Sequence, residues 1–240
     1  MLFVFTGCSN NIPESNPIDT MATTEQTSPS ENTTVSTENT LSAETQETIA
    51  EETFPQETEP ENIPEPNNED LVEISKYIPN IVVELKYATT DNFTGVVIYD
   101  NNVAMLRYGT VKKLINVQKE LNELGYTLVI WDAYRPKEAQ FKLWDVCPDS
   151  RYVANPHKGF SSHSRGNTID ITIQKLNGDF VEMPTKFDEF SRLADRDYSD
   201  VSNIAKENSL LLETLMKKYG FKPYSAEWWH YSDTKSYDVV

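Results

Sequence analysis

The segment SSHSRGNTID, residues 161–170, decides how the C-terminal half of the chain folds. It holds His163, one of three histidines in the chain, and Asp170 follows seven residues later. On a helix these two side chains would lie about 10 Å apart along the axis, because each residue rises about 1.5 Å. Gly166 and the β-branched run after it argue against a helix. We therefore predict a loop that turns at Gly166 and enters a strand, which brings His163 and Asp170 together.

A second short stretch, EWWH at residues 227–230, supplies the other groups that a metal site needs. His230 would be a third ligand beside His163 and Asp170. Two histidines, one carboxylate and a water make a tetrahedral catalytic zinc site with an open position. Glu227 would then lie beside that water as a general base. The alternative for His230 is a half-buried histidine that packs beside core tryptophans.

An arginine lies upstream of both stretches, in DAYRP at residues 132–136. Arg135 follows a predicted buried strand and directly precedes Pro136. An arginine at that point can reach across a cleft and stabilise an oxyanion. An ordinary surface ion pair is the alternative on local grounds.

The negative charge of the chain is concentrated in its N-terminal third. Residues 1–70 hold 15 of the 38 acidic residues and none of the 21 lysines and arginines. Residues 9–70 are rich in Thr, Ser, Glu, Asn and Pro, and Phe54 is their single aromatic residue. Such a composition cannot bury enough apolar surface to offset its ordering entropy, so we predict a disordered acidic linker over residues 9–70. The acidic excess also argues against nucleic acid as a partner.

Residues 71–240 carry nearly balanced charge and are long enough for one domain with a sizeable core. The predicted helices are residues 110–125, 136–144 and 201–220, and the predicted strands are residues 71–77, 81–87, 126–133 and 227–233. Residues 169–183, IDITIQKLNGDFVEM, predict two strands joined at Asn177-Gly178, a strong hairpin signal. We therefore predict an α+β fold in which helices flank an antiparallel central sheet.

Taken together, the three motifs resemble those of the vancomycin-resistance-type D-alanyl-D-alanine dipeptidases. DAYRP, SSHSRGNTID and EWWH agree with that family in order, spacing and flanking residues. YATTDNFTG, residues 87–95, also resembles the N-terminal segment of the family. The resemblance covers about residues 71–235 and implies a zinc D,D-peptidase domain with a Hedgehog/D,D-peptidase-like fold.

The resemblance also implies roles for the residues that match. It assigns one Zn²⁺ per chain to His163, Asp170 and His230. It makes Glu227 the catalytic base, and it gives Arg135 the stabilisation of the tetrahedral intermediate.

Other matching residues concern the substrate. KFDEF, residues 186–190, matches a segment whose aspartate receives the substrate ammonium, which is Asp188 here. Ser161 and Ser162 match serines near the substrate carboxylate. The chain departs from the family twice, because it reads SRLADRDYSD at residues 191–200 where a Ser-His pair is frequent, and Met183-Pro184 replaces Met-Gly. Both departures leave the metal ligands alone and concern the substrate pocket.

We expect the chain to hydrolyse the D-Ala-D-Ala dipeptide with zinc, in peptidoglycan turnover or dipeptide scavenging. The nearest alternative is a D,D-carboxypeptidase that trims stem peptides. Asp188 separates the two, since a counter-charge for a free ammonium favours dipeptides. A zinc-containing wall-binding module without turnover is a further alternative, against which Glu227 argues. No obligate protein partner is evident from the sequence.

The first residues, MLFVFTGCSNN, resemble the lipobox of bacterial lipoproteins, in which a cysteine becomes the lipidated N-terminus. Residues 1–8 would then be the remnant of the signal, and Cys8 the attachment point. Phe5 departs from the usual leucine, and the apolar run is short for a complete signal. The long polar segment after Cys8 fits a spacer. We expect a domain anchored by lipid outside the bacterial cell membrane, with a secreted or cytoplasmic protein as the alternative.

Replacement of Cys8 tests this anchor. Because the cysteine sulfur carries the lipid in such proteins, Cys8→Ser should abolish labelling by a fatty-acid probe in cells that express the chain behind a complete signal. The unchanged chain is the positive control. Equal label in both proteins would contradict attachment at Cys8.

Overall fold

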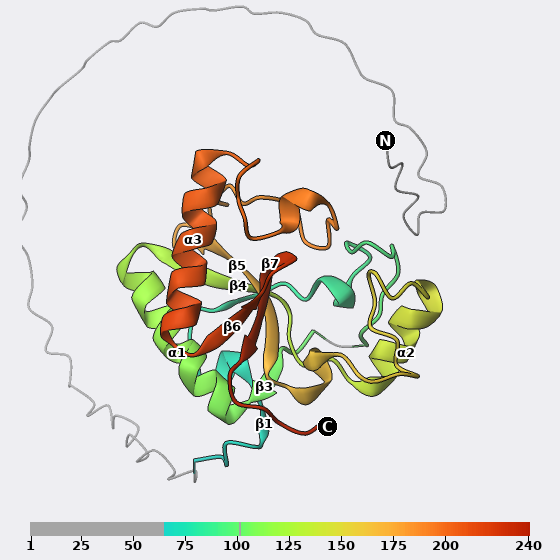
Figure 1. The fold of residues 1–240 in the computed structure, drawn as a ribbon. Helices are drawn as coiled ribbons and strands as arrows, with labels where there is room; N and C mark the ends of the chain where they lie inside the picture. Colours follow the sequence, from blue (N-terminus) through green and yellow to red (C-terminus); the bar gives the residue numbers. More distant parts are fainter. Residues whose placement is uncertain (1–64, 101) are drawn as a thin grey trace, which may run out of the picture. The chain divides into compact units, whose positions relative to one another are not determined.

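The computed structural model describes residues 65–100 and 102–240. The predictions for Cys8, for residues 1–8 and for most of the linker at 9–70 fall outside this range. The described part mixes three α-helices with two β-sheets along the chain, which confirms the α+β prediction (Figure 1). Within this part, no helix combines the length and the apolar character needed to cross a membrane.

A five-stranded sheet forms the centre of the domain, in the order β2-β4-β5-β7-β6. Its strands are β2 (Val82–Val83), β4 (Tyr126–Asp132), β5 (Thr168–Lys175), β7 (Glu227–Asp233) and β6 (Phe221–Tyr224). The pairs from β4 to β6 are antiparallel, as predicted. The pair of β2 with β4 is parallel, because the chain returns between them through a helix. Two further strands, β1 (Leu71–Glu73) and β3 (Met105–Arg107), form a separate antiparallel pair.

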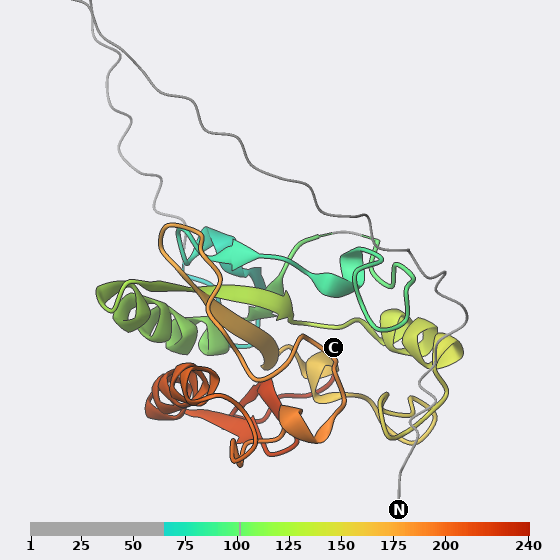
Figure 2. The same ribbon diagram turned by 90° about the horizontal axis from the view of Figure 1, so that it is seen from above.

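Two long helices lie next to each other on one side of the sheet, α1 (Tyr108–Glu123) and α3 (Asn203–Lys218). The third helix, α2 (Lys137–Val146), lies on the opposite side of the molecule (Figures 1 and 2). α1 packs on β4 and α3 packs on β6. The side chains that α1 buries recur at helical spacing, namely Val111, Leu114, Val117 and Leu121. Burial of each is worth about 1.5–3 kcal/mol, so this stripe anchors the helix.

Strand β5 carries both core and site residues, because successive side chains of a strand point to opposite faces. One face carries Ile169, Ile171 and Ile173, and the other carries Thr168, Asp170 and Thr172. All six are buried, and the three isoleucines belong to the hydrophobic core. At β5 the sheet thus has an apolar face that belongs to the core and a polar face that can hold functional side chains.

The strands predicted at residues 71–77 and 81–87 are shorter than expected. Each begins as a strand and then tightens into a 3₁₀ turn, at Ile74–Lys76 and at Lys86–Ala88. The second turn lies against β4 and buries the ring of Tyr87, whose hydroxyl donates to Asp188 at 2.7 Å. The prediction of continuous strands was wrong there because a tertiary contact overrides the local β-propensity.

The predicted hairpin at Asn177-Gly178 is also only partly formed. β5 reaches the turn, but the returning chain makes one bridge, between Gln174 and Phe180, and no second strand. Pro184 has no N–H to give to a ladder. The chain instead continues toward the cleft that Asp188 lines.

Shortening the chain from its N-terminus tests what the described domain requires. The carbonyl oxygens of Asn68 and Asp70 accept hydrogen bonds from the N–H groups of Gly109 and Tyr108, at 3.1 and 2.8 Å. A chain that begins at Glu65 keeps these contacts and lacks only residues without a catalytic motif. It should fold and match the kcat and KM of the full chain. A large fall in kcat would show that residues 1–64 contribute to the site.

Candidate metal centre

The register of three strands aligns three polar side chains across the sheet. Asp132 of β4 is opposite Asp170 of β5, and Asp170 is opposite His230 of β7. Side chains in such positions are close neighbours on one face. Asp132 reaches this row because a bulge between Ile130 and Asp132 inserts Trp131 as an extra residue. Bulges beside active sites often re-aim a side chain in this way.

His163 joins the row from the 3₁₀ turn Ser162–Arg165. The turn ends at Gly166 with a left-handed φ of 72°, which confirms the predicted turn. A side chain at Gly166 would be strained at that φ, and its Cβ would lie 2.6 Å from Cδ2 of Leu71. Ser161 caps the turn, since its Oγ accepts a hydrogen bond from the N–H of His163 at 3.3 Å.

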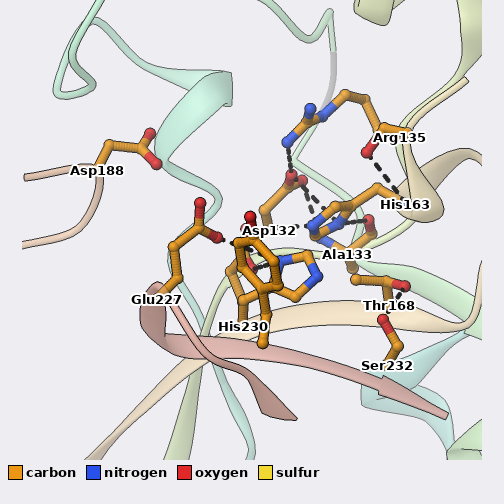
Figure 3. Close-up of polar contacts among 12 residues, drawn as sticks. Asp132, Ala133, Arg135, His163, Thr168, Asp188, Glu227, His230 and Ser232 are labelled. Carbon is orange, nitrogen blue, oxygen red and sulfur yellow. Dashed lines mark hydrogen bonds and ion pairs between the residues drawn. The ribbon is translucent and has the colours of Figure 1, made fainter. Parts of the chain in front are cut away.

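The side chains of the three predicted ligands lie close together. These residues, the metal set, are His163, Asp170 and His230. Their ligand atoms lie within 4.8 Å of one another. Nε2 of His163 is 3.3 Å from Oδ2 of Asp170, and Nδ1 of His230 is 3.0 Å from Oδ1 of Asp170. Figure 3 shows both histidines in this group, with Glu227 and Asp188 to one side and Arg135 to the other.

The chemistry of the metal set fits a zinc ion. Nδ1 of His163 lies 2.8 Å from the carbonyl oxygen of Ala133, which can only accept, so Nδ1 carries the ring proton and the lone pair of Nε2 faces the set. Oδ1 of Asp170 is buried, and although Nδ1 of His230 lies 3.0 Å away, no described residue donates a well-aligned hydrogen bond to this oxygen. A buried oxygen of this kind points to an ion or a water. Two imidazole nitrogens and one carboxylate match a zinc site with an open fourth position.

Glu227 lies at the open side of the metal set. Its Oε2 is 3.5 Å from Nδ1 of His230, and 24% of its side chain is exposed. Burial raises the pKa of Glu227, and this effect outweighs the opposing effect of His230. A carboxylate with a raised pKa accepts a proton more readily, which suits a general base.

Arg135 reaches the cleft from the loop after β4. Asp132 Oδ2 accepts from its Nη2 at 2.5 Å, and Gln140 Oε1 accepts from its Nη1 at 2.9 Å. The guanidinium also lies 5.1 Å from the ring centre of Tyr87. The residue is only 7% exposed, and its Nε donates to no described residue. Arg135 is therefore a buried, oriented donor in the cleft, and the surface ion pair considered from the sequence is wrong.

The residues predicted to bind substrate line the same cleft, which has a volume of about 610 Å³. Asp188 is buried, has a positive φ of 55° and accepts the hydrogen bond of Tyr87. Burial raises the pKa of Asp188 well above its ordinary value, and the nearby carboxylates of Asp170 and Glu227 add to this despite the Tyr87 hydrogen bond. The two serines of the sequence prediction, Ser161 and Ser162, also line the cleft.

The family model Peptidase_M15, described as D-ala-D-ala dipeptidase, matches residues 67–238. The chain belongs to this family. Its membership confirms the resemblance drawn from the motifs and the prediction of a metallopeptidase.

Two curated D-alanyl-D-alanine dipeptidases are similar to this chain in sequence. The D-alanyl-D-alanine dipeptidase of Escherichia coli (strain K12) is 38% identical over 162 residues, which are 68% of this chain and 83% of the relative. That of Enterococcus faecium is 33% identical over an alignment of 168 positions, which covers 62% of this chain and 83% of the relative. A solved vancomycin resistance D,D-pentapeptidase VanY in complex with Zn(II) is 16% identical, with a TM-score of 0.37, and covers 66% of this chain and 83% of that chain.

Sequence reasoning missed Asp132, although it lies within the DAYRP motif. Asp132 is fully buried, and its carboxylate accepts hydrogen bonds from Tyr99 Oη and Arg135. Its Oδ2 also lies 3.5 Å from Nδ1 of His163. It therefore orients both a cationic donor and a ligand of the metal set. The available signal was an acidic residue at the end of the apolar strand YTLVIWD, since a buried carboxylate needs partners.

Removal of one ligand should abolish metal binding. His163→Ala deletes the nitrogen that faces Asp170 and leaves only two of the three protein ligands. We expect loss of stoichiometric zinc, measured by elemental analysis after dialysis, together with loss of hydrolysis. The third histidine of the chain, His157, is exposed, so His157→Ala is the matched control and should keep both. Full zinc content in His163→Ala would contradict the assignment.

Glu227→Ala should separate metal binding from catalysis. The carboxylate faces the open side of the metal set, so its removal leaves the three ligands in place. Zinc content should stay at one per chain, while kcat should fall about 10²–10⁴-fold, the usual contribution of general acid–base catalysis. Steady-state kinetics on the zinc-loaded variant measures the effect. Activity close to that of the unchanged enzyme would show that another group is the base.

Proposed function

We propose that this chain is a zinc-dependent dipeptidase that hydrolyses D-alanyl-D-alanine. Membership of the family supports the reaction. The observation that carries the choice of substrate is the buried Asp188, which lines the same cleft as the metal set and Glu227. A carboxylate at that place provides a counter-charge for the free ammonium of a dipeptide.

The charges of the cleft support this proposal. Asp132 pairs with Arg135, which leaves Asp170, Asp188 and Glu227 without a lysine or arginine within ion-pair distance among the described residues. Buried carboxylates repel one another and are costly unless a cation or hydrogen bonds compensate them. A divalent metal and a substrate ammonium together would supply the missing positive charge.

The residues of the cleft have distinct tasks in the hydrolysis. His163, Asp170 and His230 would hold a zinc ion, which would supply Lewis-acid chemistry to the cleft when bound. Glu227 accepts the proton of the attacking water and returns it to the leaving amine. Arg135 donates to the oxygen on which negative charge develops, and Asp132 keeps it aimed there. Because Arg135 is already oriented and buried, it needs little reorganisation during the reaction.

The two ends of the dipeptide would be held on either side of the scissile bond. Asp188 would bind the ammonium, and Ser161 and Ser162, which line the same cleft, would receive the carboxylate. The hydroxyl of Tyr87 keeps Asp188 oriented through its 2.7 Å hydrogen bond. An acylated amine, as in a stem peptide, has no positive charge and would leave Asp188 buried without a cation.

Product analysis distinguishes this proposal from its main alternative. The purified zinc-loaded enzyme is incubated with D-Ala-D-Ala or with a stem pentapeptide that ends in D-Ala-D-Ala, and products are identified by mass spectrometry. Release of D-alanine from the dipeptide with little release from the pentapeptide supports the dipeptidase. The reverse preference would establish a D,D-carboxypeptidase, and no release from either would leave a binding module.

We also propose that the enzyme acts outside the cytoplasmic membrane, anchored through Cys8. The Thr6-Gly7-Cys8 sequence and the acidic polar segment after it support this location. The D-Ala-D-Ala used for wall synthesis is made in the cytoplasm, so an exported enzyme does not deplete that pool. Turnover of the wall or scavenging of released dipeptides is then a better role than resistance to glycopeptides.

Replacement of Asp188 tests whether its carboxylate binds the ammonium group of the dipeptide. Asp188→Asn keeps the shape of the side chain but weakens the pairing with an ammonium. Hydrogen bonds to charged groups are worth about 1.5–3 kcal/mol. The loss in kcat/KM on D-Ala-D-Ala should therefore be roughly 10- to 150-fold at 1.4 kcal/mol per decade.

The loss should be small on N-acetyl-D-Ala-D-Ala, which has no ammonium. Glu189→Gln is the matched control, since Glu189 is the next residue and is exposed. Equal losses on both substrates would mean that Asp188 does not bind the amine, and the carboxypeptidase would become the better proposal.

A further inference from the structure

Strand β7 carries both Glu227 and His230, yet residues three apart in a regular strand point to opposite faces. The β6–β7 ladder is regular only in part, with the pairs Phe221↔Asp233, Lys222↔Ser232 and Pro223↔Tyr231. It then shifts, so that Tyr224 pairs with Glu227. Residues 228–230 are therefore extra on β7 and form a bulge. This bulge allows Oε2 of Glu227 to approach Nδ1 of His230 to 3.5 Å.

Strand β5, the other neighbour of β7, does not pair with the first residues of β7. The register of β5 with β7 ends at the pair Asp170↔His230, so residues 227–229 have no register partner on β5. Trp228 and Trp229 are buried, which fixes the depth of the segment in the core. Burial is not directional, however, and does not by itself fix the position of the backbone.

Arg196 connects the backbones of β6 and β7 where the bulge interrupts their pairing. In a continuous ladder, Tyr224 would face His230, because Pro223 faces Tyr231. The carbonyl oxygens of these two residues instead accept hydrogen bonds from Arg196: Nε donates to Tyr224 at 2.7 Å and Nη2 donates to His230 at 3.0 Å. The backbone N–H of Arg196 adds a bond to the carbonyl oxygen of Ser225 at 3.1 Å. Three donors of one residue thus hold both sides of the bulge.

Arg196 is itself held firmly. Its Nη1 lies 3.0 Å from Oε2 of Glu213 on α3 and 3.0 Å from the hydroxyl of Tyr231. The guanidinium also lies 4.4 Å from the centre of the Tyr231 ring, and only 8% of the side chain is exposed. The planar fork of arginine makes these bonds in several directions at once, which the single ammonium of lysine cannot do.

We propose that Arg196 is a positioning residue for hydrolysis, which closes the β6–β7 bulge and so holds Glu227 and His230 beside the same metal ion. It does not touch the substrate and acts through the backbone of β6 and β7. The residue lies in SRLADRDYSD, one of the two segments in which this chain departs from the family pattern. The inference rests on the proposed zinc dipeptidase function.

The test compares Arg196→Lys with Arg192→Lys. Arg192 lies in the same segment and is paired with Asp200, but its side chain is 83% exposed, so it is a matched control for the loss of a guanidinium. Two quantities are measured: kcat and KM on D-Ala-D-Ala at saturating zinc, and the zinc dissociation constant by competition with a chelator. Circular dichroism and thermal unfolding of the metal-free proteins report the fold.

We expect Arg196→Lys to fold and to lower kcat, or to weaken zinc binding, by about 10–100-fold, the usual effect of removing an outer partner of a metal site. KM should change little, and Arg192→Lys should match the unchanged enzyme in both quantities. A lower unfolding temperature with kcat and zinc affinity both unchanged would overturn the proposal, because Arg196 would then only stabilise the fold. The same shifts in Arg192→Lys would overturn it too.

A second variant covers the case in which Arg196→Lys does not fold. Glu213→Gln keeps the side-chain shape and removes the charge that orients Nη1 of Arg196. It should move kcat or zinc affinity in the same direction by a smaller factor, and the absence of any shift would overturn the proposal. Absence of hydrolysis by the unchanged enzyme would count against the proposed function instead, while the zinc measurement would still test Arg196.

Discussion

The structure is organised around one buried carboxylate, Asp170. It lies on the central strand β5, between Asp132 of β4 and His230 of β7, and His163 reaches it from the preceding loop. Burial raises the pKa of such a group, but the two histidines outweigh this and hold the pKa of Asp170 below its ordinary value. A carboxylate that stays ionised in the protein interior needs cationic or hydrogen-bonding partners. The surrounding strands and loops supply these partners and the place for a metal.

Most of the functional side chains are positioned by irregular segments of the backbone and not by regular strands. A bulge at Trp131 turns Asp132 toward the site, and a second bulge brings Glu227 to His230. Gly166 and Asp188 both have a positive φ, which glycine adopts without strain but which is uncommon for a residue with a side chain such as Asp188. Strain of this kind persists where the surrounding structure over-determines it, and it tends to occur at active sites. The regular parts of the sheet give these segments a rigid support.

Aromatic packing supports the segment that carries Asp188. Trp131, which the first bulge inserts, contacts the rings of Phe187 and Trp228, with centroids 5.4 and 5.5 Å apart. Phe187 precedes Asp188, so the packing of its ring helps to place the carboxylate on the cleft side. The pairs are tilted or edge-on, an arrangement that favours aromatic contacts. Rigid packing beneath the cleft lowers the freedom of the groups that must align there.

The sequence by itself determined the class of fold, the long helices α1 and α3, the strands β4 and β7, and the turn at Gly166, because each depends on local periodicity or on one permissive residue. Its motifs also predicted the three residues of the metal set, which the structure brings together, since ligand types are limited by chemistry. Only the tertiary structure decided the parallel pairing of β2, the incomplete hairpin after β5 and the partners of Asp132 and Arg196. Those features depend on contacts between segments far apart in the chain, where register and bulges are set by packing and not by local propensity.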